Sequence, residues 1–373
     1  MTFKPLTEND IVNTRTLLHE AIPLTGTILS GTYNSENIKN YSHGMFQSVY
    51  DYPYLSSSAN HIFDITVGID TNSSLYSLIT TSNGQKSKKK NIYNQMSQVL
   101  MGYDATGSIL KFDEDGDIIG GGNKLNECIV LPFARLLSKD EVKKESFALT
   151  LGVNNNYDTP FATARVITVS DVSASTEYRV NSPVGEYGIL YATASASGQF
   201  LNTSSTHTAS INGVTYWYAG LLFYQAGVAV LTASLFGSQL NEAGSGIGGT
   251  LQFNNVAGLH RINSVLTASQ ISGAADNFRH RVKNLQFNNT TELNSTVYFC
   301  RANHNEFNYS SNPTYTSNSK IRVKSQATDD PLAYITTVGL YNDNNELMAT
   351  AKLSEPLKKS PATEFTIRTR LDY

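Results

Sequence analysis

The stretch Thr215–Phe236, TYWYAGLLFYQAGVAVLTASLF, carries no charged side chain over a length that would cross a lipid bilayer. Gln225 and the Ala-Gly pair after it divide the stretch into two apolar halves, and both halves are rich in aromatic or β-branched residues. Two such runs on either side of a short turn are typical of paired strands. We therefore predict two buried strands joined by a turn, and no membrane span.

Alternating apolar and polar side chains predict further strands along most of the chain. Residues 60–70 place Phe63, Ile65 and Val67 on one side and polar or small residues on the other, which is typical of a half-buried strand. Short strands separated by Gly, Ser and Asn turns indicate β-sandwich or barrel-like domains. The other predicted strands lie at 147–153, 162–170, 187–195 and 295–302. The predicted fold class is mainly β, all-β or α+β, with a few short helices.

Three helices are predicted between the strands. Thr7–Asp10 resembles a capping box, and the apolar residues after it predict a helix that ends at Pro23. Residues 90–102 place apolar side chains at helical spacing, directly after a lysine-rich run at Lys86–Lys90. We interpret that run as a solvated loop rather than as a site for phosphates or an acidic partner. A second capping box, Ser138–Glu141, predicts another short helix.

The C-terminal part of the chain is predicted to form a β-hairpin followed by a terminal strand. The hairpin consists of Ala333–Tyr341 and Glu346–Leu353, across a turn of Asn and Asp residues. Pro356 and Pro361 predict turns after it, and residues 365–373 alternate in polarity up to the last residue. We expect that terminal strand to join a sheet of this chain or of a neighbour.

The order of the predicted elements indicates three consecutive domains. We expect a mixed α+β N-terminal domain at 1–145 and a β-rich central domain at 146–300. A C-terminal β-hairpin or docking domain is expected at 301–373.

Charge and composition exclude several classes of protein. The chain has 28 basic and 31 acidic residues, a formal net charge of −3, so it offers no overall positive field to a nucleic-acid backbone. Hydrophobic residues make up 40% of the chain, which is enough to fill cores and argues against disorder. Cys128 and Cys300 are too few for a disulfide scaffold, and the N-terminus resembles no signal peptide. We expect a rigid, β-rich protein made in a cytoplasm.

Motifs for metal or phosphate binding are weak. Asp113–Asp117 superficially resembles a calcium loop, but it departs from the EF-hand pattern, and we interpret it as a hairpin turn. Cys300 and His304 lie on a predicted strand, where a separation of about 13 Å would prevent a shared metal ion. The segment Gly244–Gly249 lacks the βαβ unit of a phosphate-binding loop and is interpreted as a turn.

No catalytic signature is present either. The chain contains no Gly-x-Ser-x-Gly elbow, and none of its seven histidines lies in a motif that would make it a catalytic base. A glycosidase, with two carboxylates held at the right separation, stays open because spacing in sequence does not reveal such a pair. Our expectation is a non-enzymatic protein without catalytic, cofactor-binding or metal-binding residues.

Four segments resemble virion structural proteins of marine T4-like tailed phages, such as those of cyanobacteria. They are LLHEAIPLTGTI at 17–28, HGMFQSVYDYPYLSSSANHIFDITVG at 43–68, NEFNYSSNPTY at 305–315 and AYITTVGLYNDNNELMATAKLSEPL at 333–357. The last segment is similar to a unit that recurs in tail-collar, baseplate and fibre-attachment proteins. The resemblance implies a location in the virion rather than an activity.

The resemblance and the composition together favour an assembly protein of the tail, neck or baseplate. We expect a homo-oligomer that docks other virion structural proteins, binds no nucleic acid and has no membrane span. A receptor-binding or tail-fibre protein that recognises a host-surface glycan is the alternative, and a tail-associated lysin is a third class. The residues expected to contact partners are Tyr309, Tyr315, Leu340, Tyr341, Phe365 and Tyr373.

Overall fold

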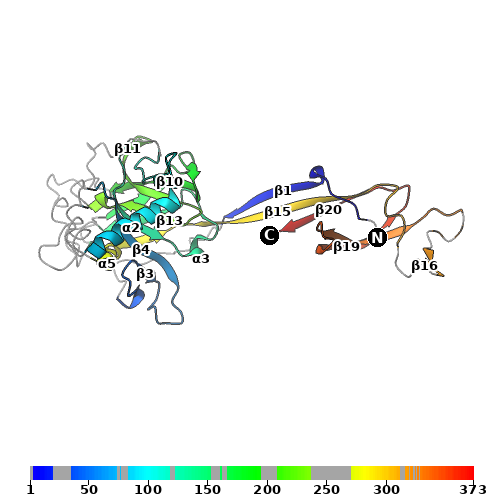
Figure 1. The fold of residues 1–373 in the computed structure, drawn as a ribbon, viewed down its shortest axis with the longest axis horizontal. Coiled ribbons are helices and arrows are strands. Elements are labelled where there is room, and N and C mark those ends of the chain that lie inside the picture. Colours follow the sequence, from blue (N-terminus) through cyan, green and yellow to red (C-terminus); the bar gives the residue numbers. More distant parts are fainter. Residues whose placement is uncertain are drawn as a thin grey trace. The chain divides into compact units, whose positions relative to one another are not determined.

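The computed structural model divides the chain into two compact units (Figure 1). Unit 1 comprises Met1–Leu18 and Glu292–Tyr373, and unit 2 comprises His19–Thr291. This division differs from the three consecutive domains expected from the sequence, because the two ends of the chain fold together. The structure describes residues 3–19, 35–73, 76, 83–117, 122–152, 160–161, 166–194, 208–236, 270–310, 316–318, 320–321, 324, 326 and 328–373.

Unit 2 is built on one twelve-stranded sheet. Ten strands follow the order β14-β7-β8-β10-β12-β13-β5-β4-β3-β2, while β11 pairs with β12 and β9 pairs with β10. All strand pairings in this sheet, taken over the described residues, are antiparallel. The strands are β2 Ile38–Asn40, β3 Gln47–Tyr50, β4 His61–Ile69, β5 Glu127–Pro132, β7 Ala148–Gly152, β8 Val166–Ser170, β9 Arg179–Ser182, β10 Gly185–Ala194, β11 Thr208–Ile211, β12 Val214–Phe223, β13 Val228–Thr232 and β14 Val282–Gln286.

The apolar stretch Thr215–Phe236 forms the middle of this sheet. β12 and β13 pair from Phe223↔Val228 to Gly220↔Leu231, across the turn that contains Gln225. The prediction of two buried strands joined by a turn is therefore confirmed. Gly220 has a φ of +147° at a bulge of β12 against β10, and a Cβ atom there would meet the Val230 carbonyl.

Both faces of the unit 2 sheet are covered by apolar packing. On β12, Trp217 and Leu222 belong to one hydrophobic cluster, whereas Leu221 and Phe223 belong to a second cluster on the opposite face. A strand buried on both faces reads as a continuous apolar run rather than as an alternating one, which explains why this stretch resembles a membrane span. The chain is mostly β, as predicted.

The helices of the described chain pack in unit 2. α2 Asn83–Leu100 and α5 Ile271–Arg279 both contact β4, and α3 Arg135–Ser138 follows β5 (Figure 1). The prediction of a helix at 90–102 is confirmed, although α2 begins earlier and includes the lysine-rich run that was expected to be a loop. Short 3-10 turns lie at η1 Glu8–Asp10, η2 Ser35–Asn37 and η4 Ala233–Phe236.

Unit 1 contains a three-stranded sheet and a separate hairpin. The sheet has the order β1-β15-β20, and β6 Glu141–Val142 pairs with the first residues of β15, which belong to unit 2. The hairpin pairs β18 with β19 in a sheet of two strands, as predicted. The strands are β1 Ile11–His19, β15 Asn289–Ala302, β16 Thr316–Ser317, β17 Lys320–Ile321, β18 Ala333–Tyr341, β19 Leu347–Lys359 and β20 Phe365–Asp372.

Two predicted helices are wrong. After Thr7 only the 3-10 turn η1 forms, and the chain then enters β1 because Asn13 and Thr14 bond to residues of β15. The capping box at Ser138–Glu141 likewise opens no helix, since α3 ends at Ser138 and Glu141 joins β6. In both places a short polar motif satisfied a local helix rule, but pairing with a distant strand determined the backbone.

The turn predicted at Pro356 is also wrong. β19 continues through Pro356 to Lys359, and its register against β18 shifts between Ile335 and Thr337. A proline lacks the N–H that a regular ladder needs, but an irregularity in the pairing accommodates it.

Candidate interaction surface

Unit 1 has almost no hydrophobic core. Among its described residues, only Val297, Ala302 and Ala333 are fully buried hydrophobic side chains. Both hydrophobic clusters of the described chain consist of unit 2 residues. A domain of about 100 residues normally buries a contiguous core. Because unit 1 lacks one, its strands are held together mainly by backbone hydrogen bonds and polar contacts.

The strands of the unit 1 sheet have both faces accessible to solvent. Residues 11–17 of β1 are all exposed, and no residue of β20 is buried. β1 is tied to β15 by polar contacts, namely the Asp10–Arg301 ion pair at 2.9 Å and the hydrogen bond from Thr296 to Asn13 at 2.8 Å. β1 and β20 are the two outer strands of this sheet among the described residues, so each has a free edge.

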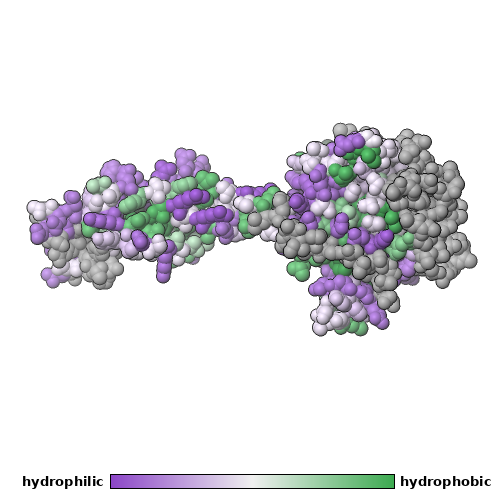
Figure 2. All heavy atoms as spheres, turned by 180° about the vertical axis from the view of Figure 1, so that it is seen from behind, coloured by the Kyte–Doolittle hydropathy of each residue, from purple (hydrophilic) through white to green (hydrophobic). Residues whose placement is uncertain are grey.

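The hairpin is equally open. Of the residues of β18 and β19, only Ala333 and Lys359 are buried. Val338 and Leu340 lie opposite Ala351 and Ala349, so one face of the hairpin carries a half-buried apolar strip. An isolated two-stranded hairpin is marginally stable in water. Figure 2 shows hydrophobic residues at the surface of unit 1 between hydrophilic ones.

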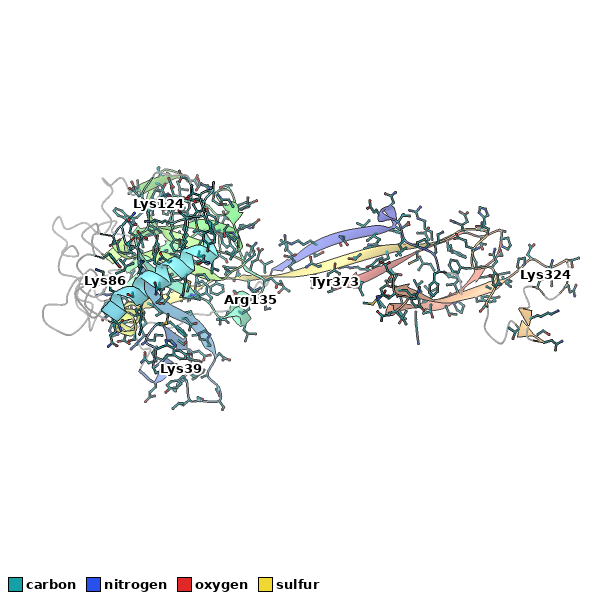
Figure 3. The ribbon with its side chains drawn as sticks, viewed as in Figure 1. Lys39, Lys86, Lys124, Arg135, Lys324 and Tyr373 are labelled. Carbon is teal, nitrogen blue, oxygen red and sulfur yellow. The ribbon has the colours of Figure 1, made fainter. Side chains whose placement is uncertain are left out.

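The residues predicted to contact partners are distributed over this open structure. Tyr309 and Tyr341 are exposed, and the Tyr341 ring meets that of Phe3 edge-on at 5.0 Å. Leu340 is half-buried on β18. Phe365 and Tyr373 lie at opposite ends of β20, and Tyr373, labelled in Figure 3, is 72% exposed. Tyr315 lies outside the described residues.

The sequence reasoning missed several apolar side chains that are just as exposed. Tyr334, Leu347 and Met348 stand out on the hairpin, and Met348 is 68% exposed. The adjacent pair Leu347-Met348, directly after a polar turn, was a usable signal, because neighbours on a strand point to opposite faces and both are apolar here. Exposed apolar residues on β1 could not be found in this way, since that segment was predicted to be helical.

A buried cation fixes one end of the hairpin. The ammonium group of Lys359 donates to the Asn308 side-chain oxygen at 2.7 Å and to the carbonyls of Ser360 and His304 at 2.9 and 3.2 Å. Burial lowers the pKa of Lys359, although Glu364 and Glu306 nearby act in the opposite direction. All three N–H donors are therefore used, and this clamp joins the loop after β15 to the end of β19.

The acidic loop at Asp113–Asp117 brings three carboxylates together. Oxygens of Asp113, Asp115 and Asp117 lie within 4.8 Å of one another, and Asp113 forms an ion pair with Lys124. Burial raises the pKa of Asp113 to about 6, while a hydrogen bond with Asp113 lowers the pKa of Asp115. Asp113 forms an isolated bridge with Lys124, and residues 118–121, the expected second arm of the hairpin, lie outside the described residues.

One serine, one histidine and one aspartate also meet. Ser48 donates to Asp64 at 2.5 Å, and the His61 ring contacts the same carboxylate oxygen at 2.9 Å. The carboxylate stands between the hydroxyl and the imidazole, so this histidine does not contact the hydroxyl whose proton a catalytic base would take.

Cys300 and His304 lie on different elements of unit 1. Cys300 lies on β15, and His304, in the turn after that strand, bonds to Glu364.

The lysine-rich run Lys86–Lys90 makes contacts within unit 2. Lys86 lies over the Tyr76 ring at 4.3 Å, and Lys88 donates to the His43 carbonyl at 2.8 Å. Lys89 is fully buried, and burial lowers its pKa to about 8. The interpretation of this run as a solvated loop is therefore wrong, because helix formation rotates Lys89 into the interior.

A polar pocket of about 430 Å³ lies in unit 2 beside residues 143–146. Asp171 fixes the segment beside the pocket. Its carboxylate accepts hydrogen bonds from the backbone N–H groups of Glu145 and Phe147, at 2.8 and 3.1 Å, and from the Tyr224 hydroxyl at 3.2 Å. Burial raises the pKa of Asp171 to about 6, against the opposite effect of these donors. The remaining lining residues are Gln286, Phe287 and Asn288.

Comparison of the chain with protein-family models, with curated proteins and with solved structures found no match. Among the described residues, no helix is both long enough and apolar enough to cross a membrane.

Proposed function

We propose that this protein is a non-enzymatic structural component of a tailed-phage virion, located in the tail, neck or baseplate. It is made in the host cytoplasm and acts by oligomerising and by docking neighbouring virion proteins. The observation that carries the proposal is the open β structure of unit 1, in which strands expose both faces and two edges while unit 2 has a complete core. The sequence resemblance supplies the virion context.

An open sheet with free edges suits docking for two physical reasons. A free edge presents unpaired backbone donors and acceptors, to which a strand of another chain can add. The exposed aromatic side chains, such as Tyr334, Tyr341 and Tyr373, contribute large contact areas at little entropic cost. Unit 2, with its sheet packed on both faces, would serve as the rigid body of the subunit.

The decisive experiment is localisation in purified particles. Mass spectrometry of the virion is expected to find peptides of this chain, and immunogold labelling is expected to mark the tail, neck or baseplate. Particles without label and without peptides would refute the proposal.

Complementation with variants tests the role of unit 1. A chain that ends before residue 364 lacks β20, and its incorporation into particles is expected to fall at least tenfold. Leu136→Ser, which changes an exposed residue of α3 in unit 2, is the control and should enter at the normal copy number. Normal incorporation of the truncated chain would contradict docking through this part of unit 1.

A second candidate function rests on a cluster of aromatic rings around β3. Tyr50 lies 6.4 Å from Tyr54 and 5.5 Å from His61, measured between ring centroids, and Tyr52 beside them is exposed. Accessible rings beside polar groups such as Asp51 and Asn60 favour recognition of a host-surface glycan. In that case Tyr52→Ala should abolish glycan binding, and immunogold label should lie on distal fibres.

A further inference from the structure

We propose that the exposed β surface of unit 1 is covered by unit 1 of a second copy of the same chain, so that unit 1 is stable only within a homo-oligomer. The inference rests on the proposed function and deepens it by naming a second copy of the chain as a partner of unit 1. It arises from the difference between the two units, because unit 2 contains both hydrophobic clusters whereas unit 1 buries only three apolar side chains among the described residues.

Unit 1 exposes a large apolar area for its length. Unit 1 has 100 residues and carries eleven exposed large apolar side chains, whereas unit 2 has 273 residues and carries ten, counted over the described residues. At roughly half exposure, and with 150–250 Å² for an aromatic side chain, the eleven expose on the order of 1,000 Å². Neighbours such as Ile11 and Val12 point to opposite faces of a strand, so a partner must cover more than one face of unit 1 to reach the roughly 800 Å² that a standard interface buries on each partner. The eleven are Phe3, Ile11, Val12, Leu17, Tyr309, Tyr334, Tyr341, Leu347, Met348, Leu371 and Tyr373.

The charge of unit 1 favours a second copy as the occupant. A surface that pairs with its own copy must not repel itself, and unit 1 contains eleven basic and eleven acidic residues, a net charge of zero. The whole excess of negative charge, −3, therefore belongs to unit 2. Charges are also paired locally, as in Asp10–Arg301 and Lys4–Glu306.

The near absence of a core gives a further reason for self-association. A segment that buries only three apolar side chains completely must acquire its remaining burial from a partner in order to stay folded. A second copy of the chain is always available at matching concentration while the protein is made. Homo-oligomers are also the commonest assemblies of soluble proteins.

Sedimentation of the purified full chain at about 1 and 50 μM tests the inference directly. The wild-type chain is expected to sediment as a multiple of its own mass. The double variant Tyr334→Ser, Met348→Ser should self-associate at least tenfold more weakly, because both side chains are exposed on the hairpin. Leu136→Ser, an equally exposed apolar position in unit 2, should leave the association constant unchanged. A monomeric wild-type chain at 50 μM would overturn the inference.

Cross-linking of the wild-type chain locates the contact without depending on any variant. Chains labelled with ¹⁴N and ¹⁵N are mixed, refolded together and treated with an amine-reactive cross-linker. Mixed-isotope peptides that join Lys352 or Lys358 of two copies are expected, since both lysines are exposed on β19. Mixed-isotope links confined to unit 2 would overturn the inference even if the chain is oligomeric.

These experiments use the purified chain alone and therefore separate two kinds of failure. If the chain is monomeric but occurs in particles, the inference fails and the proposed virion location stands. If the chain associates through unit 1 but is absent from particles, the inference stands and the virion location fails.

Discussion

Unit 2 and unit 1 are both β structures, yet they are stabilised in different ways. In unit 2 the sheet is packed on both faces, and side chains such as Trp217 and Phe223 are completely buried. In unit 1 the strands are paired but nearly bare, and polar links such as the Lys359 clamp hold them in place. Backbone pairing alone thus specifies the path of a strand, while burial of apolar area supplies most of the stability.

The largest expected effect is a cavity in the core of unit 2. Phe223 is buried between Tyr187, at 5.1 Å between ring centroids, and Phe112, at 6.4 Å. Phe223→Ala should lower the free energy of unfolding by about 3–5 kcal/mol. The fluorescence of Trp217, the single tryptophan of the chain, follows the unfolding of unit 2 in urea.

Val214→Ala on the same strand is the control, and its effect should stay below about 0.5 kcal/mol because Val214 is exposed. Equal effects of the two substitutions would show that the core of unit 2 is not packed as described.

The pH dependence of unit 2 should be the next largest effect. The pKa of Asp171 is about 6 in the folded chain, above its ordinary value of 3.8, so between these values the folded state binds more protons than the unfolded state. The contribution of Asp171 to stability should therefore be greatest below pH 4 and be lost as the pH rises through 6, by at most about 3 kcal/mol, whereas the lowered pKa of Asp115 reduces stability only as the pH falls below 4. The pKa of Asp113 is also about 6 and acts in the same direction.

Urea unfolding followed by Trp217 fluorescence between pH 4 and pH 7 measures this slope. Asp171→Asn should flatten it, and Asp113→Asn should leave the Asp171 contribution in place. A wild-type stability that rises over this range would contradict the assigned direction.

Removal of the clamp in unit 1 should have a smaller and local effect. Lys359→Met leaves the side-chain oxygen of Asn308 without its donor and removes one of several donors to the carbonyls of Ser360 and His304, at a cost of about 1–3 kcal/mol. Hydrogen exchange of the β18 and β19 amides should accelerate, whereas Trp217 fluorescence should report unchanged unfolding of unit 2.

Lys358→Met is the matched control, since the neighbouring side chain is exposed. If both substitutions accelerate exchange alike, the clamp does not stabilise the hairpin.

The smallest expected effect concerns the lysine-rich run of α2. Lys86→Gln removes the contact over the Tyr76 ring and should reduce the stability of unit 2 by about 0.5–1 kcal/mol. Lys90→Gln on the same helix, for which no such ring contact is found, should change it by less. Thermal unfolding of both variants at low and high salt distinguishes them, and equal values would show that the contact of Lys86 with the Tyr76 ring does not stabilise unit 2.

The strongest local patterns of the sequence determined the positions of many elements. The hairpin β12–β13 and the strands β4 and β18 were predicted close to their observed bounds, whereas β19 continues six residues beyond its predicted end at Leu353. Each of them combines alternating or continuous apolar residues with a turn of Gly, Asn or Asp. Such signals need only neighbouring residues, so they survive in any tertiary context.

Other features were decided only by contacts between distant residues. β1 is a strand rather than a helix because it pairs with β15, about 280 residues away. The exposure of the strand faces in unit 1 could not be predicted from the sequence either. The alternation of apolar and polar residues in β20 is the same whether its apolar face packs on a core, on a neighbouring chain or against water. Sequence periodicity specifies which side chains share a face, and only the tertiary structure decides what covers that face.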